Sequence, residues 1–433
     1  MAIGAFARSL LTHEARALLA RLALIKPFAL QEPMLPAAAL LPAAEVAIDR
    51  FLLAGRRELR LMIGHYLTWL KAAGDEVSAE EAQRRFAVLR LKFNTVLTQL
   101  DTFADVITQR SENESGVWLS GLDVVAAEAL ALPGYYDPPP VICYLDRDIG
   151  AAIRRARTRM PGGGENPVAI IRVPRERMVG TGIASSLVHE VGHQAAALLD
   201  LVNSLRSVLW RLQRGAGAAR RAWQLWERWI SEIVADFWSV ARVGIASTLG
   251  LIGVVSLPRA FVFRLNVDDP HPMPWIRVKL SAAIGEALYP HPQWQRLSET
   301  WESFYPPEGV APDTQALLQE LQATLPAFAA VLINHRPPAL RGRSLAEVMD
   351  TGARQPARLT ALFQSWQAQP PEMYRAAPTL VFAVMGQARW DGKLSPEDES
   401  LLLCKLLTFW ALRATLNMSE ICAAAPVARA RAA

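Results

Sequence analysis

Apolar side chains recur every three or four residues over long stretches of this chain, and this spacing constrains its fold more than any other feature. The clearest stretches are Glu45–Ala73 and Ala79–Arg110, separated by the turn sequence AAGDEVS. A helix has about 3.6 residues per turn, so this spacing gathers the apolar side chains on one face that must be buried. The same spacing returns after Pro292. We therefore predict a mainly α-helical protein.

The middle of the chain differs from these helical stretches. Val141–Leu145 and Val168–Val173 are short apolar runs that contain β-branched residues, which predicts two strands. We predict further helices over residues 148–159, 181–212 and 220–243, a buried helix within 243–258, and a last helix with Ser395 as its N-cap. Three parts are expected: a helical region over 1–115, a small α+β core over 116–290 and a helical region over 291–433.

Composition agrees with a folded protein of more than one packed unit. Apolar residues make up 52% and charged residues 20% of the 433 residues, which argues against long disordered stretches. The formal charge is +5, and the arginines are spread over many segments. Their densest cluster is Arg154, Arg155, Arg157 and Arg159. No aromatic residue lies within this cluster, so we interpret it as a solvated face and predict no nucleic-acid partner.

Neither a disulfide framework nor a membrane span is predicted. Cys143, Cys404 and Cys422 are far apart and odd in number, which favours a reducing compartment and a cytoplasmic location. The longest uncharged stretch, Val243–Pro258, has 16 residues, fewer than the ~18–20 that cross a bilayer. The N-terminal segment has charged residues among its apolar ones and predicts an amphipathic helix, so peripheral membrane contact stays open.

The segment LVHEVGHQA at 187–195 contains the pattern with the most specific chemistry. His189 and His193 are four residues apart, so on a helix both imidazoles lie on one face and can bind one ion. Imidazole suits zinc, and catalytic zinc keeps one position open for water. Glu190 lies beside His189, where its carboxylate can accept a proton from that water as general base. This HExxH arrangement predicts a metallopeptidase with Zn²⁺ as its cofactor.

Spacing also predicts the third metal ligand. Positions at which the metzincin pattern has Gly and His hold Ala196 and Leu199, so that pattern is excluded. In the segment SEIVADFW at 231–238, Glu232 and Asp236 are four residues apart and share a helical face. Their neighbours are apolar, so carboxylates there need partners. We predict Glu232 as the third ligand and Asp236 as the acceptor that orients a metal-bound histidine.

HEVGH at 189–193 followed by EIVAD at 232–236 resembles the gluzincin metallopeptidases, and within them the CAAX prenyl protease and HtpX-type family. That family also has a later His-Pro-x-x-x-x-Arg element, which is similar to HPMPWIRV at 271–278. The resemblance covers about residues 165–280 and implies a small α+β zincin-like core within the mainly α protein. It also implies that His271 or Arg277 stabilises the oxyanion that forms as water adds to the peptide carbonyl. Named members of the family have membrane spans, which are not predicted here.

The predicted strand ahead of the metal helix is a candidate for substrate contact. In zincins such a strand can pair with an extended substrate, which makes Ile170 and Ile171 candidate substrate-strand residues, although sheet core explains both equally well. The expected function is hydrolysis of peptide bonds in a protein or peptide substrate. Two alternatives stay open: a helical binding or scaffold protein whose zincin core is structural or inactive, and a metal hydrolase that acts on a non-peptide amide.

Overall fold

The computed structural model describes residues 3–24, 34–73, 77–147, 150–161, 163–178, 180–266 and 268–430. Over these residues the chain is mainly helical, with one small sheet of three strands. The prediction of a mainly α protein with a small α+β part is therefore confirmed. Cys143 and Cys404 are free thiols, whereas the side chain of Cys422 lies outside the described part of the chain.

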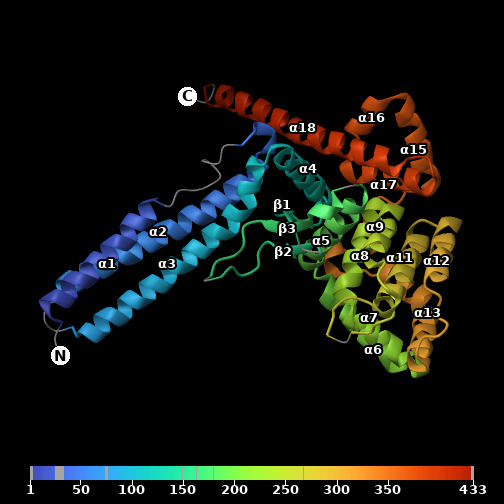
Figure 1. Ribbon diagram of the computed structural model, residues 1–433, viewed down its shortest axis with the longest axis horizontal. Helices are drawn as coiled ribbons and strands as arrows, with labels where there is room; N and C mark the ends of the chain where they lie inside the picture. The colour runs from blue at the N-terminus through green and yellow to red at the C-terminus, as the bar shows by residue number, and fades with distance from the viewer. Residues whose placement is uncertain are drawn as a thin grey trace.

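Three long helices form an arm that projects from the body of the molecule (Figure 1). They are α1 (Ala5–Leu24), α2 (Pro42–Ala72) and α3 (Ala79–Thr108). α3 begins at the N-cap Ser78, whose hydroxyl accepts a hydrogen bond from the Glu81 N–H. The buried residues of α2 and α3 follow the predicted apolar spacing, with Leu52, Leu59 and Phe93 in the core of the arm.

The sheet joins the arm to the body. Its strands are β1 (Val141–Asp146), β2 (Ala152–Arg154) and β3 (Ala169–Pro174), in the order β1-β3-β2. β1 is parallel to β3, and β2 is antiparallel to it. Successive side chains of a strand point to opposite faces, so Ile142 and Ile170 join the core of the arm, whereas Cys143 and Ile171 join the main core. The strands predicted at 141–145 and 168–173 are confirmed.

Three of the predicted helices differ in the structure. The described part of 148–159 contains β2 and turns instead of a helix, and Arg157 has a φ of 62°. The helix predicted over 181–212 is broken by Asp200, with a φ of 49°, into α5 (Gly182–Leu198) and α6 (Leu201–Gly215). A residue in the left-handed region cannot continue a right-handed helix. The helix predicted over 220–243 is broken at Trp229 into α7 (Arg220–Arg228) and α8 (Ile230–Val243).

Within the body, α5 and α8 pack closely against each other. A Cβ added to Gly192 of α5 would lie 2.8 Å from the Ala235 Cα and 2.9 Å from the Trp238 Cβ of α8. Only a glycine therefore allows the two backbones to approach this closely. The helix predicted within 243–258 is present as α9 (Ile245–Val255), which is largely buried and packs against both α5 and α8.

Of the remaining helices, α4 packs against α5, and α11 and α17 pack against α8; most of the others pack outside these three. In chain order the remaining helices are α4 (Asn113–Leu130), α10 (Arg259–Val262), α11 (Pro274–Leu288), α12 (Pro292–Phe304), α13 (Pro312–Ile333), α14 (Leu345–Val348), α15 (Pro356–Ala368), α16 (Pro370–Arg375), α17 (Pro378–Trp390) and α18 (Pro396–Ala430). One hydrophobic core runs from Leu119 to Trp410, so it is continuous across residue 290. α18 begins at the predicted N-cap, with the Asp398 N–H donating to the Ser395 hydroxyl.

Two described helices are long and apolar enough to cross a bilayer by length and composition alone. They are α13, with a mean hydropathy of 1.5, and the Pro396–Glu420 part of α18, with a mean hydropathy of 1.3. α13 packs against α11 and α7, and α18 packs along α4. Core helices of soluble proteins pass the same test, so the absence of a membrane span stays a prediction.

Gly192→Ala should lower the free energy of unfolding by about 1–3 kcal/mol, because the new methyl group would force α5 and α8 apart. The matched control is Gly182→Ala in the same helix, where an added Cβ meets no atom within 4 Å. We expect no loss of stability in this control, since alanine favours the helix. Urea unfolding of both variants checks the prediction, and equal stabilities would contradict it.

Candidate metal centre

Three predicted metal ligands meet between α5 and α8. His189 and His193 lie one turn apart on α5, and Glu232 lies in the first turn of α8. The Nε2 atoms of His189 and His193 are 3.2 Å and 3.4 Å from the Glu232 Oε2. The three ligand atoms lie within 4.8 Å of one another. The helices therefore bring together side chains that are about forty residues apart in sequence.

The donor set of this group fits a metal ion. Two imidazoles and a carboxylate are the protein ligands of a common class of catalytic zinc site. Donor atoms about 2.0–2.2 Å from one tetrahedral ion lie roughly 3.3 Å apart, which agrees with the nitrogen-to-oxygen distances of 3.2 Å and 3.4 Å. Mg²⁺ and Ca²⁺ prefer oxygen ligands throughout. His189, His193 and Glu232 could thus hold a divalent transition-metal ion.

Asp236 and Arg277 form a buried chain behind His189. The Nδ1 of His189 is 2.8 Å from the Asp236 Oδ1, which places Asp236 where an orienting acceptor was predicted. Arg277 of α11 donates two hydrogen bonds to the same carboxylate, from Nε at 2.7 Å and from Nη2 at 2.8 Å. The guanidinium group of Arg277 therefore binds the Asp236 carboxylate through two donors and holds it in place. Of the two candidates for oxyanion stabilisation, this geometry disfavours Arg277.

His271 lies at the mouth of the centre on the loop before α11. Its Nε2 is 3.1 Å from the Glu232 Oε2, and 44% of its side chain is exposed. Asp269 accepts hydrogen bonds from the His271 backbone N–H at 2.9 Å and from its Nδ1 at 2.6 Å. Sequence reasoning missed Asp269, although its place two residues before His271 is typical of an Asx-type turn. The ring is thus held with Nε2 directed to the metal centre.

Burial and hydrogen bonding shift the pKa values of the residues in this centre in opposite directions. Burial alone would lower the pKa of His189, but its hydrogen bonds to Asp236 and Glu232 outweigh this effect and raise the pKa to about 9. Burial alone would raise the pKa of Glu232, but hydrogen bonds from the three histidines hold that pKa well below its usual range. The Glu232 carboxylate is thus ionised and surrounded by nitrogen atoms, as expected for a metal ligand.

Glu190 is the one carboxylate of the centre that has no hydrogen-bond partner within the described part of the chain. It is buried, and burial raises its pKa above the usual value. A carboxylate in such surroundings is a stronger base than one in water. It lines a cavity of about 390 Å³ together with His189 and His271. Leu251 and Val255 of α9, together with Leu257 just after it, form the apolar wall of this cavity.

The sheet does not support an edge role for β3. β3 is the central strand, paired with β1 on one side and with β2 on the other. Ile170 and Ile171 are buried core residues, so their assignment as substrate-strand residues is wrong on this point. Whether a strand lies at an edge depends on which distant strands pair with it. β2 is the edge strand nearer the site, and Gly150 and Ala151 just before it line the cavity.

A buried carboxylate from α18 holds the N-terminal end of α5. Glu399 accepts hydrogen bonds from the Thr181 N–H, at 3.0 Å, and from the Thr181 hydroxyl. Its other oxygen is 3.2 Å from the Arg389 Nη1. A carboxylate at this end also interacts favourably with the helix dipole. Sequence reasoning missed this role of Glu399, because its contact lies 218 residues away along the chain.

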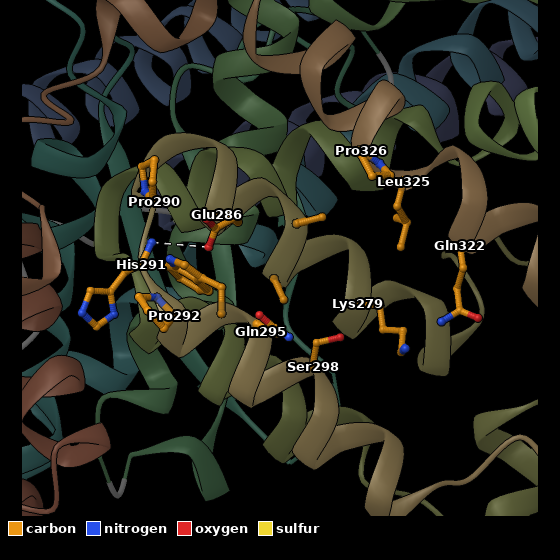
Figure 2. A pocket seen from close by; sticks show the side chains of 13 residues that line it. Lys279, Glu286, Pro290, His291, Pro292, Gln295, Ser298, Gln322, Leu325 and Pro326 are labelled. Carbon is orange, nitrogen blue, oxygen red and sulfur yellow. Dashed lines mark hydrogen bonds between the residues drawn. The ribbon is translucent and has the colours of Figure 1, made fainter.

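A larger hollow of about 700 Å³ lies elsewhere, between α11, α12 and α13 (Figure 2). Lys279, Glu286, His291 and Gln322 line it. The Lys279 amine is paired with Glu302 and lies 4.5 Å from the centre of the Trp275 ring. No residue of the metal centre lines this hollow, so its size alone carries no functional argument.

In comparisons with protein-family models, curated proteins and solved structures, nothing matches this chain.

Arg277→Gln should lower the free energy of unfolding by about 3–5 kcal/mol, because it leaves the buried Asp236 carboxylate without its cationic partner. The matched control is Arg264→Gln, since Arg264 is exposed and its replacement should change stability by less than about 0.5 kcal/mol. Chemical denaturation of the metal-free proteins measures both. A similar small effect in the two variants would show that Asp236 does not depend on Arg277.

Proposed function

We propose that this protein is a zinc-dependent metallopeptidase that hydrolyses peptide bonds of a protein or peptide substrate. The observation that carries the proposal is the convergence of the His189 and His193 nitrogens on the Glu232 carboxylate, with Glu190 next to His189 on the wall of one cavity. A purely structural zinc site needs no free carboxylate next to its ligands. This Glu190 carboxylate favours an enzyme over a helical binding or scaffold protein.

The proposed zinc ion would be held by His189, His193 and Glu232, and when bound it would lower the pKa of water and polarise a carbonyl. The residues of the chain supply the rest of the reaction. Glu190 accepts the proton of the attacking water and passes it to the leaving amine, a task suited to a buried carboxylate with a raised pKa. Asp236, held by Arg277, keeps the His189 ring oriented toward the site.

His271 is the better candidate for stabilising the oxyanion. Asp269 accepts from its Nδ1, so the ring presents its Nε2 to the cavity. Burial alone would lower the pKa of His271, but its hydrogen bonds to Glu232 and Asp269 outweigh this effect and raise it. The protonated ring carries a proton on Nε2 as well as on Nδ1, and this Nε2–H can stabilise negative charge as it develops on the carbonyl oxygen of the substrate. Arg277 is already bound to Asp236 through two hydrogen bonds, so its role is to position the metal ligands.

The cavity favours an extended polypeptide as substrate. Gly150 and Ala151, just before β2, line it, and a strand at the edge of a sheet can pair with an extended segment through backbone hydrogen bonds. Such pairing tolerates many sequences, since it uses no side chains. We therefore assign to β2 (Ala152–Arg154), in place of β3, the role of the strand along which substrate lies.

Wild-type protein prepared without chelator should contain about one zinc ion per chain, and Glu232→Ala should contain much less. Glu190→Gln should keep its zinc but cleave an unfolded protein such as casein about 10²–10⁴-fold more slowly. The matched control Glu286→Gln removes a carboxylate from the other hollow and should change neither quantity. Elemental analysis and a casein assay measure both. If wild type cannot be loaded with zinc, the proposal fails and the helical binding protein takes its place.

His271→Ala should lower kcat about 10²–10³-fold, because it removes the donor aimed at the oxyanion. Its zinc content should equal that of wild type, since His271 lies outside the group of three ligands. His13→Ala serves as the control, because His13 is exposed on α1, and it should be fully active. Loss of zinc together with activity would instead identify His271 as a ligand.

A further inference from the structure

The hairpin formed by α6 and α7, residues 201–228, holds the excess positive charge of the protein. It contains six arginines and a single acid, Glu227, which gives a formal charge of +5. The whole chain has 46 Lys and Arg against 41 Asp and Glu, also +5. The remaining residues therefore carry equal numbers of acidic and basic side chains. The two helices lie at the side of the body opposite α18 (Figure 1).

Most of this charge is exposed and has no partner. Arg206 forms an ion pair with Glu227 at 3.0 Å. The other five arginines are exposed and form no ion pair with a described residue; they are Arg211, Arg214, Arg220, Arg221 and Arg228. Like charges gathered on one hairpin repel one another and disfavour the folded state. An anionic partner would relieve this repulsion.

The outer face of the hairpin also exposes an apolar side chain among the arginines. Trp210 is 53% exposed, and it lies next to the exposed Arg211 and one helical turn before Arg214. The opposite face of α6 packs against the body, with Leu205 and Leu209 in the main core. On α7, the residues Arg221, Gln224 and Arg228 follow the helical spacing of a single outward face. They line a hollow of about 400 Å³ on this surface.

We propose that the outer face of the α6–α7 hairpin docks on a bilayer surface rich in anionic phospholipid. Guanidinium groups bind lipid phosphates, and each basic residue near such a surface adds to the attraction. Trp210 would enter the level of the headgroups, where tryptophan is favoured. The proposal rests on this surface alone and is independent of the metal centre.

The arrangement of aromatic residues favours a bilayer over nucleic acid. Proteins that bind single strands stack successive bases on several exposed aromatic rings along a groove. Trp210 is the one exposed aromatic side chain of the hairpin, since Trp223 and Trp226 are buried. A single exposed tryptophan among arginines fits a lipid interface, with the guanidinium groups remaining among the phosphates.

Sedimentation with vesicles tests this surface on the full chain. Wild-type protein should sediment with vesicles of equal parts phosphatidylcholine and phosphatidylglycerol, but not with phosphatidylcholine alone. The triple variant Arg211→Glu, Arg214→Glu, Arg221→Glu should bind the anionic vesicles at least about 100-fold more weakly. Trp210→Ser keeps the charge and should weaken binding several-fold. Binding should also fall as salt concentration rises.

The control triple variant Arg296→Glu, Arg358→Glu, Arg375→Glu makes the same change in net charge at exposed arginines of other helices, and it should bind as wild type. Equal weakening by both triple variants would overturn the proposal, because net charge and not the hairpin would then explain binding. Binding to neutral vesicles as tight as to anionic ones would also overturn it. So would binding to a random-sequence DNA oligonucleotide that is tighter than binding to vesicles and is lost in the hairpin variant.

Discussion

The close contact between α5 and α8 is the constraint on which the candidate metal centre depends. Gly192 lies between the two histidines of α5, and its missing side chain allows the backbone of α8 to approach. Only at this distance does the Glu232 carboxylate reach the nitrogens of both His189 and His193. A glycine inside a helix costs about 1 kcal/mol relative to alanine. The fold accepts this cost at a position where the helix contact and the candidate metal ligands coincide.

The need to pair buried charges near that contact explains which side chains surround it. A buried carboxylate is costly unless it is paired, and α8 brings both Glu232 and Asp236 into the interior. Asp236 is compensated by Arg277 of α11 and by His189 of α5. The centre therefore ties three helices together through a single chain of hydrogen bonds. Glu399 adds a fourth element, because it connects α18 with the first residues of α5.

The arm, the candidate metal centre and the α6–α7 hairpin differ in physical character. The arm has a hydrophobic core of its own that reaches one face of the sheet, whereas the metal centre lies on the other side, within the main core. The α6–α7 hairpin, which directly precedes α8 in the chain, carries a formal charge of +5. The proposed docking face and the candidate metal centre are thus separate.

The sequence by itself determined the features that depend on local spacing. Apolar periodicity predicted α2 and α3, short apolar runs predicted β1 and β3, and four-residue spacing placed His189 beside His193. Tertiary structure decided the features that depend on distant partners. β3 became the central strand because β2 pairs with it, and Arg277 turned to Asp236 because that carboxylate is buried. The hairpin's arginines form one surface only because the chain turns back between α6 and α7, whereas 154–159, the densest cluster in sequence, is not helical. Spacing along a chain specifies which residues share an element, but long-range packing and the need to pair buried charge specify what each side chain meets.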